Sequence, residues 1–267
     1  MLFFYPIWSL LDLPLEKALE KIKSAGYDGA ELAIDPYKTN LDDLQQCFQK
    51  HDLLLLAQHP FAKGNSFLEY EKDYSDKLNL IAQMDTVYIN CHTGTDYFSF
   101  EENLALLTVS QDIAAQSGTL IGHEIHRGRF SFHPKICAAY LETKPDLVLT
   151  ADFSHWCVVT ESLLAPFRKE VQAAINCTAH IHCRVGSDET PQVNDPFAPE
   201  HKEALQQHLI WWKEAYSKNR EKQQSLLITC EFGPPPYQQC LPYSEMPVSD
   251  IWEINKKMKN YLKKELV

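Results

Sequence analysis

The sequence predicts an α/β protein that folds as a single (β/α)₈ barrel, or TIM barrel, spanning residues 1–267. Short apolar runs alternate with amphipathic stretches along the whole chain, which is typical of a parallel sheet covered by helices. There are eight such runs, and 267 residues is close to the usual size of one barrel. Four runs in the second half also end in a residue that can bind a metal ion. Together these observations favour a barrel with a functional site at one mouth.

No linker or low-complexity tract interrupts the expected elements. Strands are expected at residues 2–10, 29–34, 53–59, 86–92, 120–126, 147–152, 178–184 and 226–231. Helices are expected at residues 14–25, 41–50, 67–84, 101–117, 134–142, 162–174, 201–218 and 250–265. Leu15, Leu19 and Ile22 have helical spacing, and Gly26 is expected to end that helix. Eight strands favour closure into a barrel, and the absence of a Gly-x-Gly-x-x-Gly motif after the first strand disfavours a dinucleotide-binding sheet.

The composition argues against several classes of protein. A formal net charge of −11 disfavours sequence-independent binding of nucleic acid, which needs clustered Lys and Arg. No apolar stretch approaches the roughly 20 residues that span a bilayer, and the first residues lack the features of a signal peptide. The eight cysteines contain no Cys-x-x-Cys pair, so we expect them to stay reduced in the cytoplasm. The expected partner is a small molecule, and a homo-oligomer is left open.

Metal-binding side chains stand at the carboxyl ends of four expected strands. They are Glu124, Asp152, His182 and Glu231. One such residue is usually a cap or half of a salt bridge, but four at one barrel mouth would leave negative charge uncompensated. Their oxygen and nitrogen donors suit one divalent ion, namely Mn²⁺, Mg²⁺, Co²⁺ or Zn²⁺. His180 would face the same side of its strand as His182, and we favour His182 as the ligand because it lies nearer the carboxyl end.

Six further side chains near the expected mouth are candidates for substrate binding. They are Trp8, His59, His92, His126, His155 and Arg184. The histidines and the tryptophan follow or end expected strands, where they can face the cavity, but each also has a simpler role as a satisfied buried residue. Arg184 can hold a hydroxyl, carboxylate or phosphate, and a salt bridge at the rim is the alternative.

Two loops are expected to shape the mouth. Residues 186–196 form a long polar segment that is a candidate lid. Three consecutive prolines follow Glu231 at residues 234–236 and are expected to stiffen that segment. The stiff segment would then present Tyr237 to the cavity.

Several short segments carry a resemblance to a known family. Gly-Tyr-Asp-Gly-Ala-Glu-Leu at 26–32, Asp-Phe-Ser-His at 152–155, His-Ile-His at 180–182 and Glu-Phe-Gly at 231–233 resemble the xylose isomerase-like TIM-barrel superfamily. Its members include sugar and sugar-phosphate isomerases and epimerases, hydroxypyruvate isomerase and the endonuclease IV nucleases. The resemblance extends over essentially the whole chain through the order of the strands.

The resemblance implies one divalent cation held by the four strand-end ligands Glu124, Asp152, His182 and Glu231. It further implies that the two glutamates remove and return a proton at the carbon next to a metal-bound carbonyl. His155, the histidine of the Asp-x-x-His motif, is then expected to bind a substrate oxygen. Arg184 departs from the better-known epimerases, whose arginine lies farther along that loop.

The leading hypothesis is a divalent-metal-dependent isomerase or epimerase that acts on a sugar or a sugar-derived keto or hydroxy compound. A metal-dependent dehydratase of a keto-sugar or cyclic polyol is an alternative, because its reaction begins with the same proton abstraction. An endonuclease IV-like nuclease is another: Asp195 has that family's spacing from His182, but Phe197 stands where the pattern has a histidine. A non-catalytic sugar-binding barrel is the last alternative, and the two glutamates disfavour it.

Overall fold

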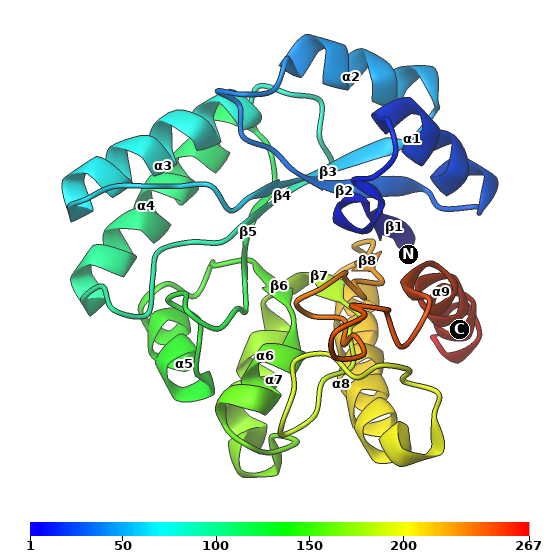
Figure 1. Cartoon of the computed structure of the whole chain (residues 1–267). Coiled ribbons are helices and arrows are strands. Elements are labelled where there is room, and N and C mark those ends of the chain that lie inside the picture. Colours follow the sequence, from blue (N-terminus) through cyan, green and yellow to red (C-terminus); the bar gives the residue numbers. More distant parts are fainter. Residues whose placement is uncertain (267) are drawn as a thin grey trace.

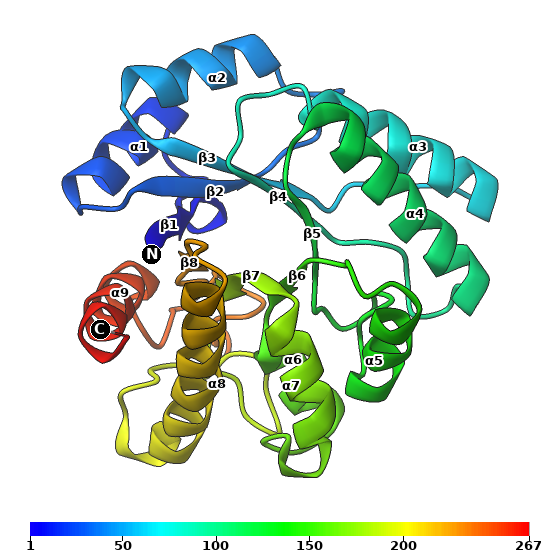
Figure 2. The ribbon, with the colours of Figure 1, turned by 180° about the vertical axis from the view of Figure 1, so that it is seen from behind.

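Eight parallel strands close into a barrel, and the helices form a ring around it (Figure 1 and Figure 2). The computed structural model describes residues 1–266. Each strand pairs with the next one in the sequence, and the last strand pairs with the first. The predicted (β/α)₈ fold is confirmed. Among the helices of residues 1–266, none has the combined length and hydropathy that crossing a bilayer requires.

The elements alternate regularly along the chain. The strands are β1 (Leu2–Pro6), β2 (Gly29–Ala33), β3 (Leu54–His59), β4 (Tyr88–Cys91), β5 (Ile121–Glu124), β6 (Leu149–Ala151), β7 (Thr178–His182) and β8 (Leu227–Thr229). The helices are α1 (Leu15–Ser24), α2 (Leu41–Lys50), α3 (Phe67–Ile81), α4 (Phe100–Ser117), α5 (Pro134–Thr143), α6 (Phe153–Val159), α7 (Arg168–Asn176), α8 (Lys202–Glu221) and α9 (Ile251–Glu265). Short 3₁₀ helices are η1 (Ile7–Leu10), η2 (Ala165–Phe167) and η3 (Pro199–His201).

Local side-chain chemistry explains where α4 begins and ends. The hydroxyl of Ser99 accepts a hydrogen bond from the backbone N–H of Glu102 at 3.1 Å, and the Glu102 carboxylate accepts one from the Ser99 N–H at 2.8 Å. This reciprocal pair satisfies two donors that the first turn of a helix leaves free. At the other end Gly118 has a φ of 74°, a left-handed conformation that glycine adopts without steric cost.

The first predicted strand is too long. The expected strand at 2–10 ends at Pro6, and Ile7–Leu10 form η1 instead. The run is apolar throughout because Ile7 and Leu10 are also buried, so its composition does not distinguish a strand from a 3₁₀ turn. Trp8 therefore lies in the turn after β1 and not at the end of a strand.

The structure contains one helix, α6, that the sequence pattern does not predict. The helix α6 begins directly after Asp152, whose side chain accepts a hydrogen bond from the N–H of Ser154 at 3.1 Å. Its first five residues are all buried, so the segment shows no amphipathic period by which to predict it. The helix expected at 162–174 begins only at Arg168, after Leu164 with a φ of 61° and the short η2.

The interior of the barrel is apolar at one end and polar at the other. Phe4, Leu56, Tyr88 and Leu227 form an apolar cluster inside the barrel. The Tyr88 hydroxyl lies 3.0 Å from that of Thr150, and beyond this contact the inward-facing side chains are polar or ionisable. A larger apolar cluster packs the strands against the surrounding helices. Polar chemistry is thus confined to the end where the strands terminate.

Lys259 connects the last helix to the first βα unit. This α9 residue is only 4% exposed. Its ammonium donates hydrogen bonds to the carbonyl oxygens of Ala25 and Gly26, the second at 3.1 Å, and it lies 4.1 Å from the centre of the Tyr27 ring. In Figure 1, α9 lies beside β1, and the contact fastens α9 to the turn between α1 and β2.

We expect Lys259→Met to lower the free energy of unfolding by about 1.5–3 kcal/mol, because two carbonyl groups lose a charged donor. Urea denaturation followed by circular dichroism measures this change. Lys264→Met is the matched control on the exposed side of the same helix, and its effect should stay within about 0.5 kcal/mol. Equal effects of the two substitutions would contradict the role given to Lys259.

Candidate metal centre

Four ionisable side chains meet at the carboxyl ends of neighbouring strands. Glu124 is the last residue of β5, Asp152 follows β6, His182 ends β7, and Glu231 lies two residues beyond β8. One potential ligand atom from each of them lies within 4.8 Å of those of the others, and all four residues are buried. The structure therefore brings together the four residues that the strand-end pattern selects.

The two ring nitrogens of His182 face different carboxylates. Its Nε2 lies 3.0 and 3.1 Å from the carboxylate oxygens of Glu31. Its Nδ1 points to the other ligands, 2.9 Å from Glu231 Oε2, 3.8 Å from Glu124 Oε1 and 3.9 Å from Asp152 Oδ2. Burial alone would lower the pKa of His182, but the carboxylates of Glu231, Glu31 and Glu124 raise it well above its ordinary value.

The surroundings of His180 are those of a structural residue. Its Nδ1 lies 3.2 Å from the hydroxyl of Thr150 and its Nε2 lies 2.8 Å from that of Thr229, so both ring nitrogens have partners. Burial lowers the pKa of His180 to about 3, so the ring is neutral. By contrast, the Nδ1 of His182 makes no aligned hydrogen bond and faces the carboxylates of the three other ligands. The geometry therefore favours His182 over His180 as the ligand.

Glu31 is a buried carboxylate at this mouth whose role the strand-end pattern does not indicate. It lies in β2, 2% exposed, and binds His182. Its Oε1 also accepts hydrogen bonds from Gln58 at 2.8 Å and from Asn90 at 3.3 Å. Burial raises the pKa of Glu31, but the charge and the hydrogen bond of His182 lower it to about 2. The available signal is a lone acidic residue inside an apolar strand of the 26–32 segment.

Glu124 also has a second set of contacts on its far side. Its Oε2 accepts a hydrogen bond from Asn90 Nδ2 at 2.6 Å and lies 2.9 Å from His92 Nε2. His92, Glu124 and His126 form a further group of potential ligands. Burial raises the pKa of Glu124, but His92 and His182 together hold it well below its ordinary value. Glu124 is therefore ionised and fixed in orientation.

Arg184 is fully enclosed next to Asp152 and Glu231. One of its terminal nitrogens, Nη2, pairs with Asp152 Oδ2 and lies 2.9 Å from His155 Nε2. The other, Nη1, lies 3.3 Å from Glu231 Oε2. The second oxygen of Asp152 accepts hydrogen bonds from the backbone and hydroxyl of Ser154. Burial raises the pKa of Asp152 to about 6, although Arg184 opposes the shift.

Two aromatic side chains, Tyr237 and Trp8, pack next to the arginines at the site. The ring of Tyr237 lies 4.5 Å from the Arg184 guanidinium and 5.2 Å from that of Arg127, and it meets the edge of Trp8 at 5.5 Å. A Cβ atom at Gly233 would lie 1.8 Å from the Trp8 ring, so only glycine lets the chain pass this close. Tyr237 thus lies against Arg184, the residue that contacts Asp152 and Glu231.

The candidate substrate-binding histidines do not share one environment. The rings of His126 and His155 are 4.0 Å apart, and His92 lies 5.0 Å from His126, so these three line one side of the site. Burial lowers the pKa of His126 to about 3. His59 instead packs on Tyr74 at 5.0 Å and its Nε2 donates to the Tyr74 carbonyl at 3.2 Å.

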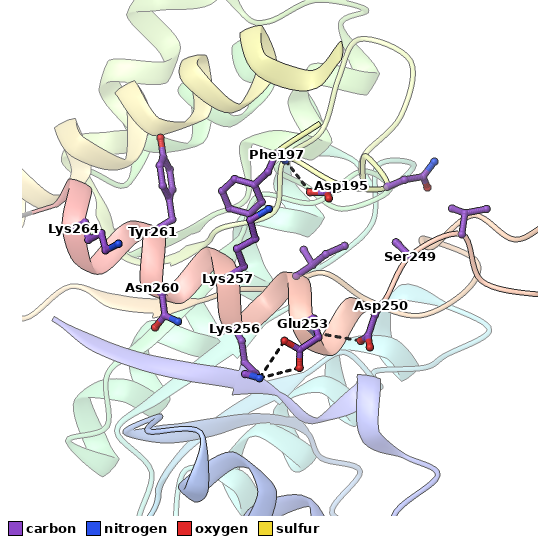
Figure 3. A pocket seen from close by; sticks show the side chains of 13 residues that line it. Asp195, Phe197, Ser249, Asp250, Glu253, Lys256, Lys257, Asn260, Tyr261 and Lys264 are labelled. Atoms are coloured by element: carbon purple, nitrogen blue, oxygen red, sulfur yellow. Dashed lines mark hydrogen bonds and ion pairs between the residues drawn. The ribbon is translucent and has the colours of Figure 1, made fainter. Parts of the chain in front are cut away.

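Asp195 belongs to none of the ligand groups of the described residues. It accepts a hydrogen bond from the Phe197 N–H at 2.9 Å and lines a groove beside α9 together with Lys257 and Tyr261 (Figure 3). Within residues 1–266, none of the ligand groups able to hold an ion includes Asp195 or His155. These groups do not test the endonuclease IV-like alternative, which stays a prediction.

The four-ligand group fits a divalent cation on structural grounds. His182 Nδ1 and Glu231 Oε2 are both buried and lie 2.9 Å apart, but neither atom makes an aligned hydrogen bond. Buried polar atoms in this state are costly unless a ligand or ion satisfies them. Three carboxylates and one imidazole are the donors that Mn²⁺, Mg²⁺, Co²⁺ and Zn²⁺ accept. Glu31 would orient the imidazole from behind, which is the usual role of a carboxylate hydrogen-bonded to a ligand histidine.

No protein-family model and no curated protein matches this chain. Solved structures do match over nearly its whole length. The xylose isomerase-like TIM barrel protein from Mycobacterium smegmatis, in complex with magnesium, has a TM-score of 0.66 at 10% identity and covers 100% of this chain and 98% of its own. D-allulose 3-epimerase from Methylomonas sp. has a TM-score of 0.65 at 16% identity, covering 100% and 98% of the two chains.

A structure described as a probable 3-DHS dehydratase from Bacillus anthracis has a TM-score of 0.63 at 15% identity and covers 98% of this chain and 99% of its own. Sugar phosphate isomerase/epimerase and endonuclease IV structures match as well. At these identities the similarity shows the fold and does not assign an activity. This chain has the fold of the xylose isomerase-like TIM-barrel proteins.

Proposed function

We propose that this protein is a divalent-metal-dependent isomerase or epimerase of a sugar or a sugar-derived keto or hydroxy compound. The observation that carries the proposal is the group of Glu124, Asp152, His182 and Glu231, whose ligand atoms lie within 4.8 Å of one another. Most proteins with the same fold in the comparison are enzymes, which supports an enzyme here. The ion is proposed to be Mn²⁺, Mg²⁺, Co²⁺ or Zn²⁺.

The two glutamates are proposed to move a proton. The bound cation supplies charge stabilisation, which makes a carbon-bound proton beside a carbonyl more acidic. Glu124 enters the site from β5 and Glu231 from beyond β8, with β6 and β7 between them. Two carboxylates that approach from different strands can remove the proton from one face of a carbon and return one to another position or face. This is the chemistry of an isomerase or an epimerase.

Side chains near the ligands are proposed to bind the substrate. His92, His126 and His155 line one side of the site, and Trp8 and Tyr237 pack against each other. Imidazole nitrogens can donate to or accept from sugar hydroxyls, and aromatic faces pack against sugar rings. Substrate binding by His59, whose ring packs on Tyr74, stays a prediction.

A metal-dependent dehydratase is the second candidate, since a dehydratase has the same fold and begins with the same proton abstraction. The two reactions have different products. Incubation with keto-sugars and cyclic polyols should produce an isomeric sugar without an unsaturated product that absorbs in the ultraviolet. Appearance of that absorbance would assign the protein as a dehydratase.

We expect added Mn²⁺ to raise the Tm of the metal-free protein. At about 100 times the Kd, a ligand that binds only the folded state stabilises it by about 2.7 kcal/mol, which corresponds to a rise in Tm of roughly 5–10 °C for a chain of this size. Differential scanning fluorimetry measures the rise, and EDTA should reverse it.

Two matched substitutions locate the effect in the chain. Asp152→Asn should abolish most of the Mn²⁺-dependent rise, because it removes a ligand charge. Asp195→Asn should retain the full rise, because Asp195 lies in the groove beside α9. If Asp195→Asn removed the rise and Asp152→Asn preserved it, the metal site would have been placed wrongly.

Glu124→Gln and Glu231→Gln should each reduce proton exchange between substrate and solvent by about 10²–10⁴-fold, because an amide cannot accept the proton. The measurement is deuterium incorporation from D₂O, followed by NMR with a panel of ketoses and sugar acids. Undiminished exchange in either variant, on a substrate that the wild type turns over, would refute the assignment of that glutamate.

We expect Glu31→Gln to weaken Mn²⁺ binding by about 10–100-fold, since the ligand histidine loses the carboxylate that orients it. Isothermal titration calorimetry measures the affinity, and circular dichroism verifies that the fold is retained. A folded variant with the affinity of the wild type would show that Glu31 has no such role.

A further inference from the structure

Both ion pairs of Arg184 are with predicted metal ligands, Asp152 and Glu231. Its Nη2 pairs with Asp152 Oδ2, and its Nη1 lies 3.3 Å from Glu231 Oε2. Both oxygens face the ligand nitrogen, because His182 Nδ1 lies 3.9 Å from the first and 2.9 Å from the second. The guanidinium and the nitrogen donor therefore converge on the same two carboxylate oxygens.

The other carboxylate oxygen of Asp152, Oδ1, already accepts hydrogen bonds. Asp152 Oδ1 accepts hydrogen bonds from the backbone N–H of Ser154 at 3.1 Å and from its hydroxyl. Ser154 belongs to the first turn of α6, so this contact also fixes the start of that helix. Asp152 therefore offers the same oxygen, Oδ2, to Arg184 and to an ion.

Arg184 has further contacts besides its ion pairs with the ligand carboxylates. Its guanidinium lies 4.5 Å from the centre of the Tyr237 ring, its Nε donates to the Ser154 hydroxyl at 3.3 Å, and the residue is 2% exposed. A buried positive charge held this firmly next to a site for a dication repels that dication. It also compensates the carboxylates when no cation is bound.

We infer that Arg184 is an internal counter-ion that competes with the divalent cation for Asp152 and Glu231 and thereby sets the metal affinity of the site. The inference rests on the proposed function, since it requires a cation at these ligands. In the metal-free protein Arg184 neutralises the ligand carboxylates. Asp152 and Glu231 would hold a bound cation, and the guanidinium donors of Arg184 would then be free for oxygen atoms of a substrate.

The test compares Mn²⁺ affinity and metal-free stability in three variants. Arg184→Gln removes the charge and should tighten Mn²⁺ binding by at least about tenfold, because the like charge is gone, while the Tm of the metal-free protein falls because two buried carboxylates lose their partner. Arg184→Lys keeps the charge without the two-pronged geometry and should tighten binding by a smaller factor. Calorimetry gives the Kd and scanning fluorimetry gives the Tm.

Arg127→Gln is the matched control. Arg127 stacks on the same Tyr237 ring at 5.2 Å, and within residues 1–266 it makes no ion pair with a ligand carboxylate. Its substitution should change the Kd by less than about threefold, since no ligand oxygen is released. A tenfold tightening in this variant would mean that general charge, and not competition at the ligands, sets the affinity.

The outcomes separate this inference from the proposed function. Mn²⁺ binding by wild type with unchanged or weaker binding by Arg184→Gln would overturn the inference and leave the metal site intact. Binding only after Arg184→Gln would support competition strongly. Absence of binding in the wild type and in every variant would reject the metal site and the inference together. If Arg184→Gln does not melt cooperatively, Arg184→Lys decides, and a Kd no tighter than that of the wild type overturns the inference.

Discussion

The compensation of buried negative charge is the constraint on which the functional end of this barrel depends. Glu31, Glu124, Asp152 and Glu231 are each at most 6% exposed at one mouth. Carboxylates brought this close cannot all stay ionised without positive partners. Within the described residues, the ion pairs that these carboxylates form are with His182, Arg184 and other nearby histidines. The proposed divalent cation would supply further positive charge to these carboxylates.

The rest of the fold makes this concentration of charge tolerable. Apolar side chains fill the other end of the barrel, and the larger apolar cluster joins strands to helices. Glu31 and the pair of threonines around His180 form polar layers between the apolar cluster and the ligands. The strands thus supply rigid positions for the ligands, while Tyr237 and Trp8 lie on connecting segments and pack against each other. Loop-borne groups on a rigid scaffold are the usual basis for different chemistry on one fold.

The strand-end pattern was sufficient to predict the barrel and the meeting of the four ligand residues, because carboxyl ends of parallel strands converge at one mouth. Other features depend on tertiary contacts that no local pattern records. The helix α6 is buried on all sides, so it lacks an amphipathic period. Glu31 is identified only through its contact with His182, 151 positions away in the chain. The choice between His180 and His182 likewise depends on the two threonine hydroxyls that satisfy His180.

Anomalous diffraction from crystals of the wild-type protein grown with Mn²⁺ would locate the ion. One strong anomalous peak is expected within bonding distance of Glu124, Asp152, His182 and Glu231, with Arg184 moved away from at least one of the carboxylates. A protein that binds Mn²⁺ at another position, or a mouth in which Arg184 keeps both carboxylates and no peak develops, would contradict this expectation.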